Sequence, residues 1–412
     1  MVDSMKLHLE NMGPVNEANI NISDITVVGG HNSTGKSTLS KVLYSFLRSN
    51  SLNRQEIAYD SISKLIHRES RYILRDLDED NAINLKYGSP MFGVTAAPGF
   101  EGVLKYYEEL KYQVHLSGCE KKFDERFKMI DDLIRVVEED SKELYISLMR
   151  TLMESEFSSN IFDCYIDIQD NIIDFKNYEF DDDEAFKSVN NFIIDEVFYI
   201  DSVSVLDTLD GHFFSNRNKT DHLEHLKKKL RDNDNDVFDA KINKDLIDLG
   251  KEINEIINGK FIFERGEFKF ITNKNIKSNM QNTASGIKQI GLIQILIANR
   301  KLSQNSFLII DEPEVNLHPE WQFKLAKILV LISKKLNISV YINTHSPLFI
   351  ESIHTYADYY DVLDKTTYHL AEIDDDTVKI NEVDENDLSR IYDDLGKPYF
   401  DMDIIRLEKE LD

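Results

Sequence analysis

The segment that most constrains the fold of this chain is a glycine-bearing sequence near the amino terminus, Gly30-His31-Asn32-Ser33-Thr34-Gly35-Lys36-Ser37. It follows a short apolar run, Ile25–Val28, and precedes the helical pattern Leu39, Val42, Leu43 and Phe46. The spacing fits G-x-x-x-x-G-K-[ST], in which glycines let the backbone turn and point its N–H groups inward at a phosphate. A strand, a loop and a helix in this order predict the start of an α/β unit that binds a nucleotide.

Each residue type in this loop has a defined task at bound phosphates. The Lys36 ammonium neutralises the β- and γ-phosphates, and the Ser37 hydroxyl takes one ligand position of Mg²⁺. The helix that begins at Lys36 adds the positive end of its dipole. We therefore predict nucleotide contacts from Gly30, Asn32, Ser33, Gly35, Lys36, Ser37 and Thr38.

Two acidic residues follow a second buried strand. The four apolar residues Phe307–Ile310 lead directly into Asp311 and Glu312. A carboxylate at the carboxyl end of such a strand suits a ligand of magnesium and its water, and we predict Asp311 in that role. Its neighbour Glu312 can orient and deprotonate the attacking water. In isolation the two acids could equally begin a loop, but together with the phosphate-binding loop they predict a hydrolytic site.

Two further segments carry residues that suit a phosphate site. His345 follows the next apolar strand, Ser339–Asn343. Because parallel strands of a nucleotide-binding sheet end on the same edge, we predict that His345 lies near the γ-phosphate. Thr283–Gln289 opens a long helix, in which Ser285 can act as the N-cap and Gly286 allows a phosphate close to the free N–H groups. An ordinary capped helix has the same pattern.

The order of these four elements resembles that of the ABC-type ATPases, and within them the SMC/RecF/OLD branch. The resemblance rests on the opening hairpin pattern Met5–Ile22 and on three later strings, Ala284–Gln289, Asp311-Glu312-Pro313-Glu314-Val315-Asn316-Leu317-His318-Pro319 and Thr344-His345-Ser346-Pro347. The D-E-P-E-x-x-L-H-P and T-H-S-P strings are typical of single-chain ATPases of bacterial phage-defence and abortive-infection systems. The similarity covers roughly residues 1–48, 195–210 and 260–355.

This resemblance implies a fold and a chemistry. The expected fold is α/β, an ABC-ATPase head with a P-loop, a mixed sheet and an antiparallel N-terminal hairpin, plus a largely helical insertion. The expected cofactors are ATP and Mg²⁺, and the expected activity is hydrolysis of ATP to ADP and phosphate. Glu312 and His345 would be the catalytic residues, and Ser37 and Asp311 would hold the metal.

The resemblance also implies an assembly in which two heads sandwich two nucleotides. Ser285 and Gly286 would then contact the γ-phosphate held by the phosphate-binding loop of a second copy. The segment Asn316, Leu317 and His318 would cross the dimer interface. Because ATP completes the interface, ATP binding is expected to drive dimerisation and hydrolysis to reverse it.

Three features depart from the family pattern. Ile287 stands where a second glycine of the signature is expected, so only one glycine approaches the phosphate. No glutamine follows the strand Glu196–Ile200, and Asp201 or Ser202 could hold the second-shell water in its place. The part of the chain after His345 is too short for a nuclease domain of the OLD type, and its Asp374–Asp376 triplet is typical of a hairpin turn rather than a metal site.

The chain is expected to divide into four parts. Residues 1–48 are the N-terminal part of the head, and 49–194 are a mainly helical insertion. Residues 195–355 hold the helical lobe, the signature, both acids and the histidine, and 356–412 form a small C-terminal region.

Three details within these parts are open to a structural test. The acidic stretch Asp163–Glu184 is either a binding surface for a basic partner or a solvated loop or helix face. Two short strand-like pieces lie between Tyr368 and Glu382. A helix is expected over Asp387–Asp412, with a break at Gly396–Pro398.

Charge and composition limit the partners and the environment. With 48 Lys+Arg against 74 Asp+Glu, a net charge of −26 repels DNA and anionic lipid, so nucleic acid needs a local basic patch. The best such patch is Lys227-Lys228-Lys229 with Arg231, although a solvated helix end has the same composition. Two cysteines cannot form a disulfide framework, and no apolar run is long enough for a membrane span. We expect a cytoplasmic protein without membrane contact.

Three functions are compatible with these features. The leading one is an ATPase that dimerises through ATP, as a homodimer or higher oligomer, and regulates a partner effector protein in bacterial anti-phage defence. The alternative is a DNA-associated repair or recombination ATPase similar to SMC and RecF, which the net charge and the lack of a sustained coiled coil disfavour. The third is the nucleotide-binding subunit of a transporter, which the missing glutamine and the incomplete signature disfavour.

Overall fold

The computed structural model describes most of the chain as helices and strands. The described residues are 5–51, 54–79, 100–138, 142–157, 164–168, 171–174, 179–180, 194–201, 204–207, 220–231, 244–264, 267–279, 283–302, 304–374, 377–385 and 387–411. They belong to two compact units, one formed by Met1–Ser51 with Arg150–Asp412 and the other by Leu52–Met149.

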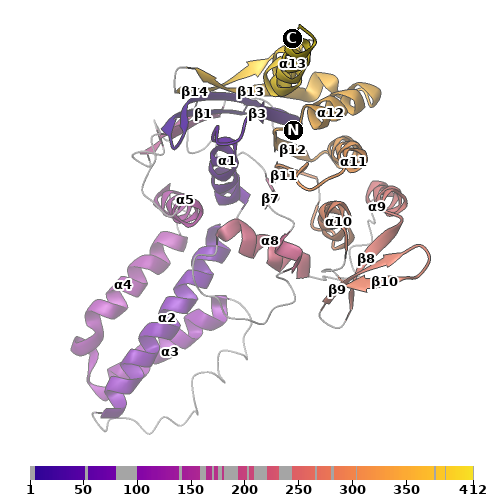
Figure 1. The fold of residues 1–412 in the computed structure, drawn as a ribbon. Coiled ribbons are helices and arrows are strands. Elements are labelled where there is room, and N and C mark those ends of the chain that lie inside the picture. Colours follow the sequence, from indigo (N-terminus) through magenta and orange to yellow (C-terminus); the bar gives the residue numbers. More distant parts are fainter. Residues whose placement is uncertain are drawn as a thin grey trace. The chain divides into compact units, whose positions relative to one another are not determined.

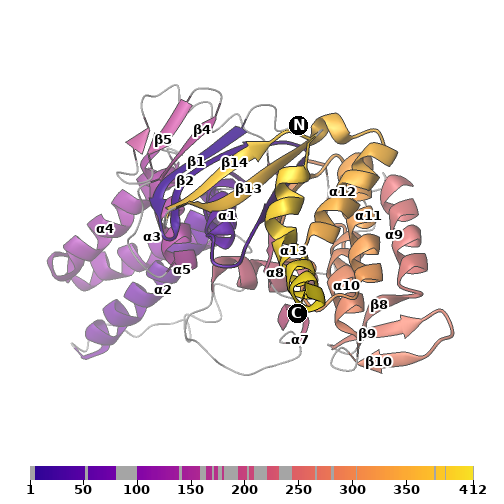
Figure 2. The same ribbon diagram turned by 45° about the horizontal axis from the view of Figure 1, so that its top comes forward.

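A mixed β-sheet forms the centre of the larger unit (Figure 1 and Figure 2). Its parallel part contains, in spatial order, β13 (Thr366–Asp374), β3 (Ile25–Gly30), β12 (Ser339–Thr344), β11 (Ser306–Asp311) and β7 (Glu196–Ile200). Strands β3, β11 and β12 are buried along their whole length, as their continuous apolar runs predict for strands covered on both faces. Since neighbouring strands run parallel, their carboxyl ends meet at one edge.

The N-terminal hairpin is confirmed. Strands β1 (Met5–Met12) and β2 (Val15–Ile22) pair antiparallel, and Gly13 in the turn has a φ of 58°, which glycine adopts without strain. The acidic stretch Asp163–Glu184 contains β4 (Cys164–Ile168), β5 (Asn171–Asp174) and β6 (Glu179–Phe180). The alternative of a solvated loop or helix face was wrong because the isoleucines of this stretch suit strands, and β4 pairs with the backbone of β1 that would otherwise be an open edge. A binding surface for a basic partner stays a prediction.

The C-terminal region completes the same sheet. The two strand-like pieces are confirmed as β13 and β14 (Thr377–Val383), and β13 pairs with β3 in the middle of the sheet. Asp374 pairs with Thr377, which confirms a hairpin turn there, while Asp375 and Asp376 lie outside the described residues. The predicted break in the last helix is wrong: α13 (Ser389–Leu411) continues through it. A proline removes one helix hydrogen bond, and burial of Ile391 and Leu395 in the core anchors the helix before it.

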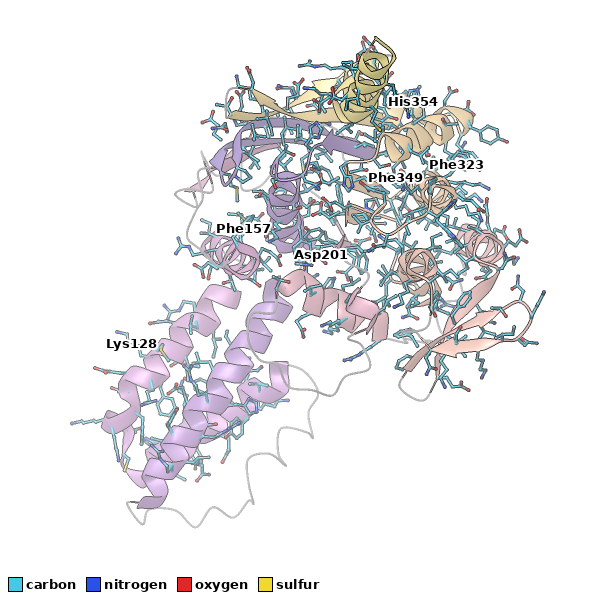
Figure 3. The ribbon with its side chains drawn as sticks, in the orientation of Figure 1. Lys128, Phe157, Asp201, Phe323, Phe349 and His354 are labelled. Atoms are coloured by element: carbon cyan, nitrogen blue, oxygen red, sulfur yellow. The ribbon has the colours of Figure 1, made fainter. Side chains whose placement is uncertain are left out.

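Helices cover both faces of the parallel strands. Helix α1 (Lys36–Ser51) packs against β7, β11 and β12, whereas α12 (Pro347–Tyr359) and α13 pack against β3 from the opposite face (Figure 1). Helix α11 (Pro319–Leu336) lies next to α12, α9 (Lys244–Ile256) packs against α11, and α10 (Ser285–Ala298) packs against α9 (Figure 1). Apolar side chains fill the space between this layer and the sheet, and Phe349 of α12, labelled in Figure 3, is fully buried there.

Smaller elements complete this unit. Helices α7 (Ser204–Asp207) and α8 (Asp221–Arg231) follow β7, and the short 3₁₀ helix η3 (Leu363–Lys365) precedes β13. Strand β8 (Gly259–Glu264) pairs antiparallel with β9 (Glu267–Thr272), and β10 (Lys277–Asn279) extends this second sheet.

The other unit is helical, as the periodicity of this part of the sequence predicts. It contains α2 (Arg54–Glu79), α3 (Phe100–Ser117) and α4 (Glu120–Glu138), and α5 (Lys142–Phe157) leads the chain back into the larger unit. Its core joins apolar residues of α2, α3 and α4, including Ile66, Tyr107 and Phe127. None of the helices in the described ranges is long and apolar enough to cross a membrane.

Candidate functional site

The phosphate-binding loop connects the carboxyl end of β3 to α1, as its motif predicts. Packing requires both of its glycines. A side chain on Gly30 would place its Cβ 2.7 Å from the Cβ of Ala371 on β13. Gly35 has a φ of 80°, and a Cβ there would overlap Val15 in the N-terminal hairpin. The C-terminal strand and the N-terminal hairpin thus enclose the loop from two sides.

The polar residues predicted to bind the nucleotide line this loop. Asn32, Ser33 and Ser37 are exposed, and Thr38 is half-buried in the first turn of α1. Ser33 has a φ of 66°, in the left-handed region, where a non-glycine residue is uncommon. The strained, exposed turn is what a loop needs to present several backbone N–H groups to one anion.

The side chain of Lys36 is folded back into the loop. It is buried, and its Nζ donates hydrogen bonds to the carbonyl oxygens of Gly30 at 2.8 Å and His31 at 2.6 Å. Burial lowers the pKa of Lys36, and the nearby carboxylates of Glu312 and Asp311 act against that shift. The ammonium therefore lies inside the loop, with the acidic groups at the carboxyl end of β11 close to it.

Asp311, at the end of β11, is fixed by three hydrogen-bond donors. Its Oδ1 accepts from the Asn343 amide at 2.5 Å and from the Ser40 hydroxyl at 3.4 Å, and its Oδ2 accepts from the Tyr199 hydroxyl at 2.9 Å. The Asn343 amide also donates to the backbone carbonyl of Lys36 at 2.8 Å. These bonds join the acid of β11 to the helix that carries the phosphate-binding loop, so the two parts cannot move independently.

The negative charge of Asp311 acts on its buried neighbours. Burial raises the pKa of Tyr199 and of Tyr341 well above the usual range, and the Asp311 carboxylate raises both further. Both phenols therefore stay neutral, and Tyr199 remains a hydrogen-bond donor to Asp311.

Glu312 leaves the strand in an unusual backbone conformation. Its φ is 46°, and its N–H donates to the Asn343 carbonyl at 2.9 Å. Holding a non-glycine residue in this region costs on the order of 1–3 kcal/mol, and such residues are concentrated at functional sites. The turn leaves the Glu312 side chain 38% exposed, whereas Asp311 beside it is buried. One acid is thus held within the protein and the other faces outward.

His345 lies beside these acids, held by a carboxylate that we did not assign from the sequence. The buried Glu314 accepts the backbone N–H of His345 at 2.7 Å, and its Oε1 lies 3.1 Å from the ring Nδ1, an ion-pair distance without hydrogen-bond alignment. The same ring nitrogen lies 3.9 Å from Glu312. The structure therefore brings Lys36, Asp311, Glu312 and His345 together at one edge of the sheet.

The signature segment is placed differently from the phosphate-binding loop. Helix α10 begins at Ser285 with Ala284 as its N-cap and without a side-chain cap, so the prediction of Ser285 as N-cap is wrong by one residue. The atoms nearest to a Cβ on Gly286 belong to Leu317 and Trp321, at 3.1 to 3.3 Å. The signature therefore adjoins the segment Asn316–His318, in which Asn316 and His318 are exposed and Leu317 is buried.

Three residues of this site were missed in the sequence analysis. Asn343 is a buried polar residue at the end of an apolar strand, and this break in the apolar run was the available signal. Glu314 stands within the D-E-P-E string, but its burial could not be read from the string. Tyr199 lies on β7 next to β11, and only the register between these strands places it beside Asp311.

Two weaker predictions meet different outcomes. Asp201, a candidate for the missing glutamine, directly follows β7 and contacts His222, whereas Ser202 lies outside the described residues. In the basic patch, Lys229 forms an ion pair with Glu196, and Lys227 lies 3.9 Å from Glu224. Part of the positive charge there is therefore already neutralised within the chain.

A phosphate-binding loop between a buried strand and a helix, with an acid at the end of another parallel strand of the same sheet, defines the P-loop class of nucleotide-binding proteins. The sequence profile of the family described as AAA ATPase domain matches residues 5–350. This chain belongs to that family. No curated protein matches it.

Solved structures with a similar fold include ATPase heads and a transporter component. The SMC head domain from Thermotoga maritima is 11% identical, with a TM-score of 0.40 over 92% of this chain and 98% of that one. The SMC head bound to the C-winged helix domain of ScpA is 9% identical, with a TM-score of 0.43 over 92% and 96%. The cbiO1 protein from Clostridium perfringens, part of the ABC transporter complex cbiONQ, is 12% identical, with a TM-score of 0.32 over 98% of both chains.

Proposed function

We propose that this chain is a cytoplasmic ATPase of the SMC/ABC type that binds ATP with Mg²⁺, dimerises through it and releases the dimer on hydrolysis. The observation that carries the proposal is the set of bonds from Asn343 to Asp311 and to the Lys36 carbonyl. These bonds hold the acid in a fixed position relative to the phosphate-binding loop. Such preorganisation is what stabilises a developing phosphoryl charge without reorganisation during the reaction.

The residues present fit a magnesium ion. A carboxylate offers about four lone-pair positions, and three donors already contact Asp311, so one position is left for the metal or its water. The exposed hydroxyl of Ser37 at the start of α1 would supply a second oxygen. When bound, the ion neutralises charge on the β- and γ-phosphates.

The protein groups then divide the work of hydrolysis. Lys36 donates to the phosphates in place of the Gly30 and His31 carbonyls that it now contacts. The outward-facing Glu312 orients the attacking water and accepts its proton, and His345 stabilises the γ-phosphate from the adjacent strand end. Attack in line with the leaving oxygen needs no covalent intermediate, so positioning and charge neutralisation supply the rate.

The signature segment supplies the contact to a second copy in this proposal. Gly286 is buried beside Leu317 and Trp321, and the exposed Asn316 and His318 flank Leu317 in the sequence, which supports a shared interface of the two segments. Ser285 and Gly286 would meet the γ-phosphate bound by the other copy, with the segment Asn316–His318 at the interface. ATP then stabilises the dimer by an amount set by its affinity for the joined surfaces.

We further propose that the dimer regulates an effector protein in bacterial anti-phage defence. The D-E-P-E-x-x-L-H-P and T-H-S-P strings support this role by resemblance. The described residues after 356 complete the head sheet and cover it. The alternative, a DNA-associated ATPase similar to SMC and RecF, is tested directly by DNA stimulation of hydrolysis.

The central test measures hydrolysis and mass together. Phosphate release by the purified chain should require Mg²⁺, and Glu312→Gln should abolish it while retaining ATP binding. Size-exclusion chromatography with light scattering should then show a stable dimer of Glu312→Gln with ATP and not with ADP. A monomer under both conditions would refute the sandwich. Addition of duplex DNA separates the alternatives, since a several-fold rise in turnover would favour the SMC/RecF-like function.

A further inference from the structure

A buried histidine outside the proposed catalytic set lies directly behind the site. His222, in the first turn of α8, has a side chain that is 2% exposed, and its ring centre lies 4.5 Å from that of Tyr199. The Tyr199 hydroxyl donates to Asp311 at 2.9 Å. One ring contact and one hydrogen bond therefore separate His222 from the acid at the end of β11.

Two carboxylates from different elements face this histidine. Its Nδ1 lies 2.6 Å from Oε2 of Glu156 on α5, and its Nε2 lies 3.2 Å from Oδ2 of Asp201 at the end of β7. Glu156 has a fully buried side chain and also accepts the backbone N–H of His222 at 3.1 Å. The neighbouring Ser155 hydroxyl accepts the backbone N–H of Asp221 at 2.9 Å. These hydrogen bonds hold the end of α5 against the start of α8.

The two carboxylates determine the charge of the ring. Burial alone lowers the pKa of His222, but the contacts with Asp201 and Glu156 outweigh burial and raise it to about 9. At neutral pH an imidazolium therefore lies between two carboxylates. A buried ion of this kind is stable only while its partners stay in place, so the three side chains hold one another in a single arrangement.

Asp201 links this cluster to the nucleotide edge of the sheet. Strands β7 and β11 are parallel and in register, with Ile200 opposite Ile310, so the next residues along the strands, Asp201 and Asp311, come level. The Asp201 side chain is 34% exposed, and its Oδ2 is the oxygen that contacts His222. Both carboxylates act on the Tyr199 hydroxyl and raise its pKa, although burial contributes most.

We propose that Glu156 and His222 are positioning residues, which hold Asp201 and Tyr199 at the nucleotide edge in the geometry that hydrolysis needs. Two carboxylates at the same level of adjacent strands repel each other, and the imidazolium behind them offsets that repulsion. Tyr199 is held by the same ring and in turn holds Asp311. The cluster begins on α5, the helix by which the chain returns from the helical unit, so the position of α5 influences the site. This inference rests on the proposed ATPase function.

The test compares two buried histidines of one helix. His222→Gln and Asp201→Asn should each lower kcat for ATP hydrolysis by about 10-fold, as changes behind metal-site ligands do. The KM for ATP and the affinity for a fluorescent ATP analogue should stay within about twofold, because neither residue contacts the phosphate-binding loop. The double variant should be no slower than the single ones, since both changes break the same cluster.

The matched control is His225→Gln. His225 lies one turn along α8 and is also buried. It stacks on Phe198 in the middle of β7 and lies 2.9 Å from Glu196 at the amino end of that strand. This variant should lose thermal stability and keep kcat. Asp201→Asn changes a partly exposed side chain and keeps its shape, so it tests the inference even if His222→Gln fails to fold.

The outcomes separate this inference from the proposed function. An inactive wild-type chain would refute the ATPase itself. An active wild type with unchanged kcat in His222→Gln and in Asp201→Asn would overturn the inference and leave the ATPase standing. An equal loss of kcat in His225→Gln would also overturn it, because the loss would then follow from destabilising α8.

Discussion

The two ends of strand β7 carry buried charge clusters of different composition. At the carboxyl end, Asp201 and Glu156 enclose His222, and the pKa of that ring is raised to about 9 despite burial. At the amino end, Glu196 contacts Arg48 at 3.0 Å, His225 at 2.9 Å and also Lys229. There burial lowers the pKa of His225, and the charges of Arg48 and Lys229 assist, although Glu196 acts in the opposite direction.

The contrast shows that burial does not by itself decide the charge of a histidine. The first ring lies between two carboxylates, whereas the second shares one carboxylate with two permanent cations. The carboxyl-end cluster adjoins Asp311, while the amino-end cluster joins α1, β7 and α8 at the far end of the strand. We therefore expect changes at the carboxyl end to affect activity and changes at the amino end to affect stability.

The largest effect should come from Lys36→Ala, a change at the edge of the sheet where the parallel strands have their carboxyl ends. A charge-assisted hydrogen bond contributes about 1.5–3 kcal/mol, so removing the ammonium should weaken ATP binding by about 100-fold. The free energy of unfolding should change little, because the side chain bonds mainly to loop carbonyls. Titration with a fluorescent ATP analogue measures the first quantity and urea denaturation the second. An undiminished affinity of Lys36→Ala for ATP would show that the phosphate-binding loop does not bind the nucleotide.

Glu196→Gln tests the amino end. Burial raises the pKa of Glu196, but His225, Lys229 and Arg48 outweigh it and lower the pKa to about 2. We expect the change to cost about 2–3 kcal/mol of unfolding free energy at pH 7 and to leave kcat unchanged.

The sign of the pH dependence sharpens this prediction. A carboxyl group with a lowered pKa stabilises the fold above its ordinary value near 4.5, and the contribution is lost as pH falls toward 2. Urea denaturation at pH 7 and at pH 3 should therefore show a smaller difference between wild type and Glu196→Gln at the lower pH. A loss of kcat in Glu196→Gln would contradict the expectation that changes at the amino end of β7 affect stability and not activity.

His222 should give the opposite pH dependence. Because its pKa is raised to about 9, its contribution to stability is complete below the ordinary value near 6.5 and is lost as pH rises through 9. The wild type should lose about 2 kcal/mol of unfolding free energy between pH 7 and pH 9 that His222→Gln does not lose. Parallel curves for the two proteins would mean that the ring is not charged in the folded state.

Glu314→Gln should have the smallest effect. Glu314 follows the carboxyl end of β11, at the same edge of the sheet. The amide oxygen can still accept the His345 backbone N–H, but the negative charge beside the ring is removed. We expect kcat to fall by about 10-fold, or about 1.4 kcal/mol, with unchanged ATP affinity. Glu252→Gln, in an ion-pair cluster with Lys327 and Lys335, is the control and should retain full activity. An equal loss in both would exclude a specific role for Glu314.

Much of the fold could be predicted from local patterns. Continuous apolar runs identified β3, β11 and β12, because burial on both faces leaves a direct trace in the sequence. The strands in the acidic stretch around β4 were not predicted, since the charges of this stretch suggested solvent while its pairing with β1 is a long-range property. The predicted break in α13 failed because one proline removes little when neighbouring residues are anchored in the core.

The residues of the candidate site also fall into those that local sequence patterns predict and those that they do not. Lys36, Asp311, Glu312 and His345 were predicted because each follows or begins an element at a known edge of the sheet. Glu314, Asn343 and Tyr199 could not be predicted as site residues, since their roles depend on strand register and on side-chain direction.

The order of strands in the sheet has a consequence for synthesis on the ribosome. Strand β3, which leads into the phosphate-binding loop, pairs on one side with β12 and on the other with β13, so Ile25 meets both Val340 and Thr366. Both neighbours are translated more than 300 residues after β3, and contacts so distant in sequence form slowly. The nascent chain must therefore carry the apolar strand β3 without these two partners until β12 and β13 have been translated. That interval is when a chaperone would have most to protect.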